Sequence, residues 1–252
     1  MAANVHDCVM LFGDSITQAA WDQEGFGAKL ANAYSRKLDV LNRGLAGYNT
    51  DWAIPVFEKV FARTEDQGRV PKVRLLVIWF GANDACIEPS PQHVPVTKFV
   101  SNLKHIVSLV RSPKSMFYSP ETKIILITPP PINTHQRRAD LASRTPPQEL
   151  DRLFDTTKQY AEAVKDAATE EKVGIVDIWS ALWNGSGQEE GNLSKYLSDG
   201  LHLTREGYMV VYDELLETIR RTCPELHPDA IEYVFPRWDE VAGLNRAGNA
   251  GA

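Results

Sequence analysis

Cysteine is scarce in this sequence of 252 residues, and its scarcity argues against several kinds of site. The three cysteines, Cys8, Cys86 and Cys223, are widely spaced, and none belongs to a Cys-x-x-Cys pair. The sequence therefore contains no zinc-site pattern. An odd and scattered set of cysteines is also typical of proteins in a reducing compartment, so we expect no disulfide bonds.

Long apolar runs and a secretory signal are also missing. No apolar run approaches the roughly 18 residues that a membrane-spanning helix needs. The first residues lead almost directly into an apolar strand, without the basic region, apolar stretch and small-residue cleavage site of a secretory signal. We therefore expect no membrane span and a cytoplasmic location.

The sequence has no excess of positive charge and no common phosphate-binding motif. Its 27 lysines and arginines are scattered and are outnumbered by 33 aspartates and glutamates, which gives a formal net charge of −6. This balance disfavours nucleic acid or an anionic membrane as a partner. Neither G-x-x-x-x-G-K-[ST] nor G-x-G-x-x-G follows the first predicted strand, so the two commonest phosphate-binding loops are excluded there.

What is present is the composition of an ordinary globular enzyme, with 43% hydrophobic and 24% charged residues. The length suits one α/β domain, which we expect to cover residues 1–242. Residues 243–252 are rich in glycine, alanine and asparagine and are predicted to form a flexible tail.

Five short apolar segments predict the strands of one sheet, at 8–13, 38–44, 73–80, 123–128 and 173–178. Several are apolar nearly throughout, as strands are when helices cover both faces of a sheet. Apolar residues at helical spacing predict helices at 25–37, 51–62, 96–110, 150–168 and 205–219. This alternation indicates an α/β fold, a three-layer α/β/α sandwich with a five-stranded parallel sheet.

Candidate site residues lie at the ends of three of the predicted strands. Ser15 follows the first strand in Gly-Asp-Ser, Gly44 ends the second, and Asn83 follows the third in Gly-Ala-Asn-Asp. Chemistry in open α/β sheets collects at the carboxyl ends of the strands, so Ser15 is a candidate nucleophile. Asn83 offers an amide donor at the same edge. Each of these sequences is also an ordinary turn when it stands alone.

A candidate base follows the fifth strand, in Asp199-Gly200-Leu201-His202. An aspartate three residues before a histidine on a turn can accept the Nδ1–H of the imidazole, which leaves Nε2 free to take the proton of Ser15. An isolated Asp-x-x-His is usually a surface turn, so this interpretation depends on all four junctions meeting at one edge. The other five histidines form no pattern of ligands or bases, and His105 is interpreted as structural.

Set side by side, these four blocks resemble those of the SGNH (GDSL-type) hydrolases, in the usual order and over roughly residues 8 to 220. The longer strings GDSITQ, GLAGYNTDWA, FGANDA and DGLHLTREG are similar to those of the eukaryotic isoamyl acetate-hydrolysing esterase group. The resemblance implies a flavodoxin-like SGNH fold and a serine ester hydrolase that needs no cofactor and no metal.

The resemblance also assigns roles to individual residues. It implies that Ser15 is acylated, that His202 is the base and later the acid, and that Asp199 orients His202. It further implies an oxyanion hole made by the backbone N–H groups of Ser15 and Gly44 and by the side-chain amide of Asn83.

Two positions depart from the family pattern. Gly-Asp-Ser-Leu is Gly-Asp-Ser-Ile here, and an asparagine common after the histidine block is replaced by Tyr208, which bears on substrate preference.

Bulky residues flank these motifs and suggest a narrow acyl pocket. Trp21 and Trp52 come close after two of the motifs and are candidate substrate-binding residues, whereas Trp79 and Phe80 belong to a buried strand and suit the core. We therefore expect a small-molecule ester as substrate, with a short acyl group such as acetate on a small or medium alcohol. A deacetylase of carbohydrate or lipid acetyl groups and a catalytically silent binding module are the alternatives.

Two further segments have open interpretations. Residues 132–147 are predicted to form an irregular excursion over the sheet edge, suited to a lid or pocket wall. Phe235 and Trp238 lie near the C-terminus, where they could cover the site or contact a partner subunit, which leaves a homodimer as one alternative.

Overall fold

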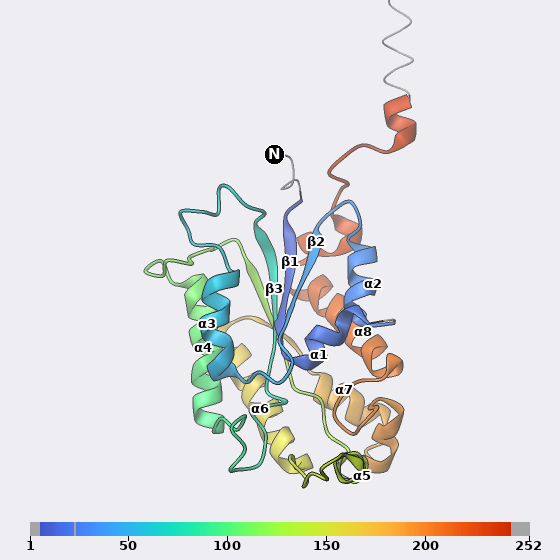
Figure 1. Cartoon of the computed structure of the whole chain (residues 1–252). Helices are drawn as coiled ribbons and strands as arrows, with labels where there is room; N and C mark the ends of the chain where they lie inside the picture. Colours follow the sequence, from blue (N-terminus) through green and yellow to red (C-terminus); the bar gives the residue numbers. More distant parts are fainter. Residues whose placement is uncertain (1–5, 23, 243–252) are drawn as a thin grey trace, which may run out of the picture.

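The computed structural model describes residues 6–22 and 24–242 (Figure 1). Its centre is one sheet of five parallel strands in the order β2-β1-β3-β4-β5. The strands are β1 (Cys8–Gly13), β2 (Asp39–Gly44), β3 (Val73–Trp79), β4 (Lys123–Ile127) and β5 (Gly174–Val176). The predicted five-stranded parallel sheet is therefore confirmed. The predicted tail, 243–252, lies outside the described residues, and the single domain over 1–242 stays a prediction.

Eight α-helices are found in the described part of the chain. They are α1 (Ser15–Gln18), α2 (Phe26–Ala33), α3 (Thr50–Val60), α4 (Val96–Arg111), α5 (Thr134–Ser143), α6 (Phe154–Glu171), α7 (Ile178–Gly185) and α8 (Arg205–Thr222). Short 3₁₀ turns occur at Ala19–Trp21, Glu190–Lys195, Pro224–Leu226 and Pro228–Ala230.

The sheet separates two apolar cores because side chains alternate between its faces. In β1, Val9 and Leu11 pack into one core, and Met10 and Phe12 pack into the other. Residues of α2, α7 and α8 fill the first core, and residues of α3, α4 and α6 fill the second. Figure 1 shows these helices on opposite sides of the sheet, which completes the three-layer sandwich.

Three helices were not predicted from the sequence: the four-residue α1, which was expected as a turn, and the longer α5 and α7. The segment predicted as an irregular excursion, 132–147, contains α5, whose N-terminus is capped by Asn133. Among the residues of this polar helix only Arg137 and Leu141 are buried, so it has almost no apolar stripe to recognise. The third helix, α7, begins at Ile178, where the strand prediction was wrong. Asp177 accepts the N–H of Ser180 and caps α7, which ends β5 at Val176.

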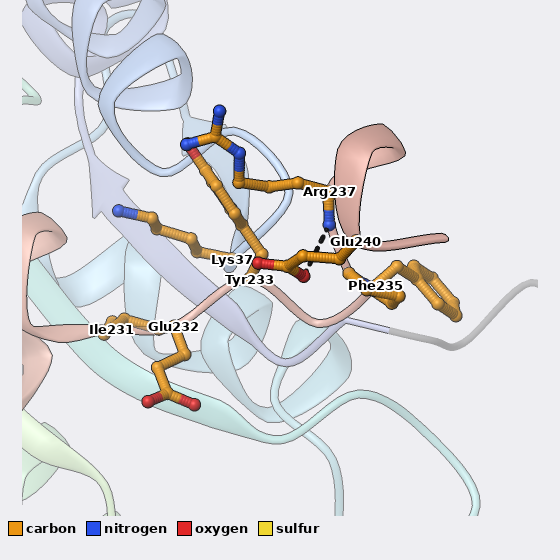
Figure 2. A pocket seen from close by; sticks show the side chains of 8 residues that line it. Lys37, Ile231, Glu232, Tyr233, Phe235, Arg237 and Glu240 are labelled. Atoms are coloured by element: carbon orange, nitrogen blue, oxygen red, sulfur yellow. Dashed lines mark hydrogen bonds between the residues drawn. The ribbon is translucent and has the colours of Figure 1, made fainter. Parts of the chain in front are cut away.

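The C-terminal segment lies at the amino edge of the sheet, away from Ser15. The N–H of Val234 donates to the carbonyl of Arg36, and the Arg36 side chain donates to the carbonyl of Phe235. This segment lines a hollow of about 470 Å³ with Lys37, which precedes β2 (Figure 2). Phe235 and Trp238 therefore do not cover the site of their own chain, and the contact with a partner subunit stays a prediction.

Candidate active site

The sheet register brings the polar junctions of three strands to one edge. Gly13 at the end of β1 lies beside Gly44 of β2 and Trp79 of β3. The N–H of Leu45 donates to the carbonyl of Gly13 at 2.8 Å, which joins the ends of β1 and β2. The segments that follow these strands therefore begin side by side, as the sequence predicted.

Ser15 begins the short helix α1 directly after β1. Oδ1 of Asp14 accepts the N–H of Ile16 at 3.0 Å and caps this helix. Asp14 is 1% exposed, and burial raises the pKa of its carboxyl to about 7. The N–H of Ser15 belongs to the first turn, where a helix supplies no carbonyl to accept it, so this donor is available to a ligand.

His202 joins Ser15 to Asp199 through its two ring nitrogens. Oγ of Ser15 lies 3.0 Å from Nε2 of His202, and Nδ1 lies 2.9 Å from Oδ2 of Asp199. Because the carboxylate accepts the Nδ1–H, Nε2 is left as the acceptor for the Ser15 hydroxyl. The structure thus brings together the three residues that the sequence singled out.

Backbone hydrogen bonds hold the Asp199 carboxylate in place. Its Oδ1 accepts the N–H of Leu201 at 2.9 Å and the N–H of His202 at 2.8 Å. Burial opposes ionisation, but the hydrogen bonds from the His202 ring and from both backbone N–H groups outweigh it and keep the pKa of Asp199 well below its usual range. The carboxylate is therefore ionised over the physiological pH range.

Asn83 is held from both ends of its side-chain amide. Nδ2 donates to the carbonyl of Tyr48 at 2.8 Å, while Oδ1 accepts from Nη2 of Arg152 at 2.8 Å and from Nε2 of Gln92 at 3.3 Å. These partners fix the orientation of the amide. An amide nitrogen carries two hydrogens, so the second N–H of Asn83 is available to a bound group.

Gly44 is packed too tightly for any other residue. A Cβ atom there would lie 2.0 Å from the backbone nitrogen of Gln18, in the neighbouring helix α1. The Gly44 N–H donates to Oδ1 of Asn42 at 2.8 Å, and Nδ2 of Asn42 donates to the carbonyls of Thr17 and Gln18. This predicted oxyanion donor therefore has an intramolecular acceptor, which a substrate oxygen must share or replace.

The two candidate pocket tryptophans are half exposed, and the two core aromatics are buried. Trp21 is 45% and Trp52 is 41% exposed, and the Trp52 ring meets Tyr48 edge-on with centroids 6.1 Å apart. Trp79 and Phe80 are buried, as predicted for core residues. Trp21 and Trp52 keep accessible aromatic surface near the ends of β1 and β2.

Three charged residues next to this site were missed by sequence reasoning. Arg137, Asp151 and Arg152 form ion pairs beside Asp199 and Asn83. They lie in or after the predicted excursion, and no local motif distinguishes them from surface charges.

Within residues 6–22 and 24–242, there is no group of three or more histidine, cysteine, aspartate or glutamate side chains that could hold a metal.

Comparison with known proteins identifies the family. Residues 11–210 match the GDSL-like lipase/acylhydrolase family. The chain belongs to this family. This GDSL-family protein is accordingly a carboxylic ester hydrolase. No helix in the described part of it is long and apolar enough to cross a membrane.

Relatives of this GDSL-family protein match it over most of its length. The isoamyl acetate-hydrolyzing esterase 1 homolog of Bos taurus is 38% identical over 239 residues, covering 93% of this chain and 88% of that protein. The isoamyl acetate-hydrolyzing esterase of Saccharomyces cerevisiae is 32% identical over 247 residues, covering 92% and 94%. A GDSL esterase/lipase of Arabidopsis thaliana is 36% identical over 243 residues, covering 94% of each chain.

Solved structures share the fold at lower identity. The lipase/acylhydrolase of Enterococcus faecalis has a TM-score of 0.62 at 21% identity, covering 90% of this chain and 98% of that one. A catalytic mutant of an acetylxylan esterase of Geobacillus stearothermophilus has a TM-score of 0.61 at 18% identity, covering 94% and 100%. These likenesses establish the GDSL-hydrolase fold.

Proposed function

We propose that this protein hydrolyses esters with short acyl groups, chiefly acetates of small to medium alcohols, through an acyl-enzyme at Ser15. The observation that carries the proposal is the hydrogen-bonded series from Ser15 Oγ to His202 Nε2, at 3.0 Å, and from His202 Nδ1 to Asp199, at 2.9 Å. The acetate preference rests on the relatives, two of which bear the name isoamyl acetate-hydrolyzing esterase or its homolog.

In the first half of the reaction, Ser15 Oγ attacks the carbonyl carbon of the ester while Nε2 of His202 takes the hydroxyl proton. The tetrahedral intermediate collapses when His202 returns this proton to the departing alcohol oxygen, which leaves the acyl group on Ser15. In the second half, His202 takes a proton from water as its oxygen attacks the acyl carbon. The carboxylic acid then leaves, and Ser15 recovers its proton.

The ionised Asp199 stabilises the imidazolium that forms in each half and keeps Nδ1 protonated, so that Nε2 is the nitrogen that exchanges protons. The negative charge on the former carbonyl oxygen is stabilised by the N–H groups of Ser15 and Gly44 and by the amide of Asn83. Because Tyr48 and Arg152 already hold the Asn83 amide, it needs no reorientation when the charge appears.

The deciding experiment measures kcat/KM for p-nitrophenyl acetate, butyrate, octanoate and palmitate. We expect the maximum at acetate or butyrate, and a maximum at octanoate or beyond would refute the short-acyl proposal. Labelling of Ser15 by a fluorophosphonate probe distinguishes the hydrolase from a silent binding module. Acetylated oligosaccharides in the same panel test the deacetylase alternative.

The cytoplasmic location and the homodimer stay predictions for this protein. Light scattering during size-exclusion chromatography measures the molar mass in solution. A value of twice the 28.2 kDa chain would support the dimer.

A further inference from the structure

We propose that Arg137, Asp151 and Arg152 form a largely buried ion chain that positions the two halves of the active site relative to each other. One half is His202, the general base, together with Asp199, which orients it. The other half is the oxyanion donor Asn83. The proposal rests on the catalytic roles given to those residues under the proposed function.

At the end of the ion chain near the general base, Arg137 and His202 donate to the same carboxylate oxygen of Asp199. Its Nη1 donates to Oδ2 of Asp199 at 2.9 Å, and the same Oδ2 accepts the Nδ1–H of His202 at 2.9 Å. Arg137 lies in α5 and its side chain is 5% exposed. It therefore fixes the position of the carboxylate oxygen that orients the imidazole.

Asp151 connects the two arginines. Its two oxygens accept a forked pair of hydrogen bonds from Nε and Nη2 of Arg137, at 3.0 and 2.7 Å, and Oδ2 also accepts from Nη1 of Arg152. A forked arginine–carboxylate pair fixes both distance and angle. Burial opposes ionisation of Asp151, but the hydrogen bond from Arg137 and the charge of Arg152 outweigh it and lower the pKa of this carboxyl.

At the oxyanion end, Arg152 holds the acceptor end of the Asn83 amide. Its Nη2 donates to Oδ1 of Asn83 at 2.8 Å, and its Nε donates to the carbonyl of Ala82. The Arg152 side chain is 3% exposed. With Oδ1 fixed in this way, the amide cannot rotate by half a turn and present its oxygen to the developing negative charge.

The arrangement is a positioning device because its three members act through Asp199 and Asn83, the residues assigned to the reaction. The two buried arginines alternate with the partly exposed carboxylates of Asp199 and Asp151, and Asp140 lies 3.5 Å from Arg137, so the charges compensate one another. Removing a member changes the charge near His202, and the sign of the change depends on the member removed. A contact that contributed only packing would not produce effects of opposite sign.

The expected pH effects follow from the charges around His202. Asp199 lies on the same loop and accepts from the ring, and Arg137 binds Asp199 while also pairing with Asp140 and Asp151. Asp14, at the start of α1, interacts electrostatically with His202. Two further charges, Arg152 and Asp84, act on Asp14. Removing the positive charge of Arg137 makes Asp199 a stronger partner for imidazolium, so the enzyme becomes protonated and inactive at higher pH.

The test compares pH profiles of kcat/KM for Arg137→Gln and Asp151→Asn. We expect Arg137→Gln to move the midpoint of the acidic limb up by roughly 0.5–1 pH unit. Asp151→Asn should move it down, because a negative charge near His202 is lost and Arg137 is then shared only by Asp199 and Asp140. Arg138→Gln, an exposed neighbour on α5, is the matched control and should leave the profile unchanged.

The oxyanion end is tested by Arg152→Gln, which should lower kcat about tenfold or more with KM nearly unchanged. Arg152→Lys should recover part of the loss, because lysine can donate one hydrogen bond to Asn83. Unchanged midpoints in Arg137→Gln and Asp151→Asn, or shifts of the same sign, would overturn the ion chain. If Arg137→Gln does not fold, the ion chain is tested by the downward shift in Asp151→Asn and by the kcat values of Arg152→Gln and Arg152→Lys.

Labelling separates this proposal from the proposed function. Wild-type protein that reacts at Ser15 with a fluorophosphonate, but whose variants show unaltered profiles, would refute the ion chain alone. Wild-type protein that hydrolyses no ester and is not labelled at Ser15 would refute the proposed function, and the ion chain with it.

Discussion

Tyr208 Oη donates a hydrogen bond of 2.8 Å to the carbonyl oxygen of Ile16, the residue that follows Ser15. The Tyr208 ring also stacks on Phe26, with centroids 5.9 Å apart. Tyr208 was expected from the sequence to depart from the family pattern and to affect substrate preference. The structure gives it a different setting, because the side chain is buried and ties α8 to the turn that carries Ser15.

Tyr208→Phe should lower the free energy of unfolding by about 1–2 kcal/mol, since one buried hydrogen bond is lost and the ring stacking remains. We expect kcat to fall a few-fold through a less rigid α1, with the order of substrates unchanged. Chemical denaturation and steady-state kinetics measure both effects. Tyr212→Phe, in the same helix, is the control. A changed order of substrates at unchanged stability would instead place Tyr208 in substrate selection.

Ser15→Ala and His202→Ala should each abolish most activity, and combining them should add little, because members of a catalytic triad act as a unit. The comparison uses kcat of the two single variants and the double variant with p-nitrophenyl acetate. A double variant far worse than either single variant would contradict a shared mechanism. Stoichiometric phosphonate labelling that persists in Ser15→Ala would remove Ser15 as the nucleophile.

Asn83→Ala removes one of the proposed oxyanion donors, so kcat should fall about 10²–10³-fold with KM little changed. The control is Asn102→Ala. Asn102 is also buried, but it bonds to Thr50 and Asp51 between α3 and α4, so its loss should reduce stability more than kcat. An effect of Asn83→Ala on KM alone would make Asn83 a ground-state binding residue.

Trp21→Ala and Trp52→Ala should extend the range of acyl chains, if these rings narrow the acyl side. Each added methylene would then gain burial that the rings had prevented, worth up to about 0.8 kcal/mol. We expect the ratio of kcat/KM for octanoate to that for acetate to rise in either variant. Trp238→Ala, at the opposite edge of the sheet, is the control and should leave the ratio unchanged. An unaltered ratio in both variants would exclude Trp21 and Trp52 from the acyl pocket.

Asp84→Asn should stabilise the protein progressively as the pH rises from 4 to 7. Burial raises the pKa of Asp84 to about 6, so the folded state binds more protons than the unfolded state between about pH 4 and 6. Stability from this group is present at low pH and is lost as the pH rises through that window. Oδ1 of the asparagine can still accept both hydrogen bonds from Thr50.

The measurement for Asp84→Asn is the melting temperature of both proteins at several pH values. Asp51→Asn is a control of opposite sign. Burial of Asp51 is outweighed by its hydrogen bonds to Lys98 and Asn102, which lower the pKa of Asp51, so this variant should lose relative stability as the pH rises. A pH-independent difference between wild type and Asp84→Asn would contradict a raised pKa at Asp84.

The parts of the fold that the sequence predicted are those with a local physical signal. Strands β1, β3 and β4 are apolar runs because helices cover both faces of the sheet, and α4 shows a clear apolar stripe. Three helices were missed: α1 has only four residues and was expected as a turn, while α5 and α7 were missed for different reasons. Few residues of α5 are buried, and α7 follows β5 without a loop, so its apolar start continues the strand pattern.

The site residues likewise fall into those with a local sequence signal and those without one. Ser15, Asp199 and His202 stand in short motifs at strand ends, and the structure brings them into hydrogen-bond contact as predicted. Arg137 and Arg152 could not be found in this way, because their partners are set by how α5 and the following segment fold back onto the sheet edge. Only the folded chain distinguishes these two arginines from the exposed ones near them.

The long separation of Ser15 from His202 along the chain also matters while the protein is being made. A ribosome completes the strand and turn that carry the serine early, whereas His202 emerges 187 positions later, shortly after Asp199. An unfinished chain that ends before them has a hydroxyl with no base. If Ser15 and His202 act as proposed, such a nascent or truncated product cannot be acylated, and hydrolytic activity would then require that synthesis has passed His202.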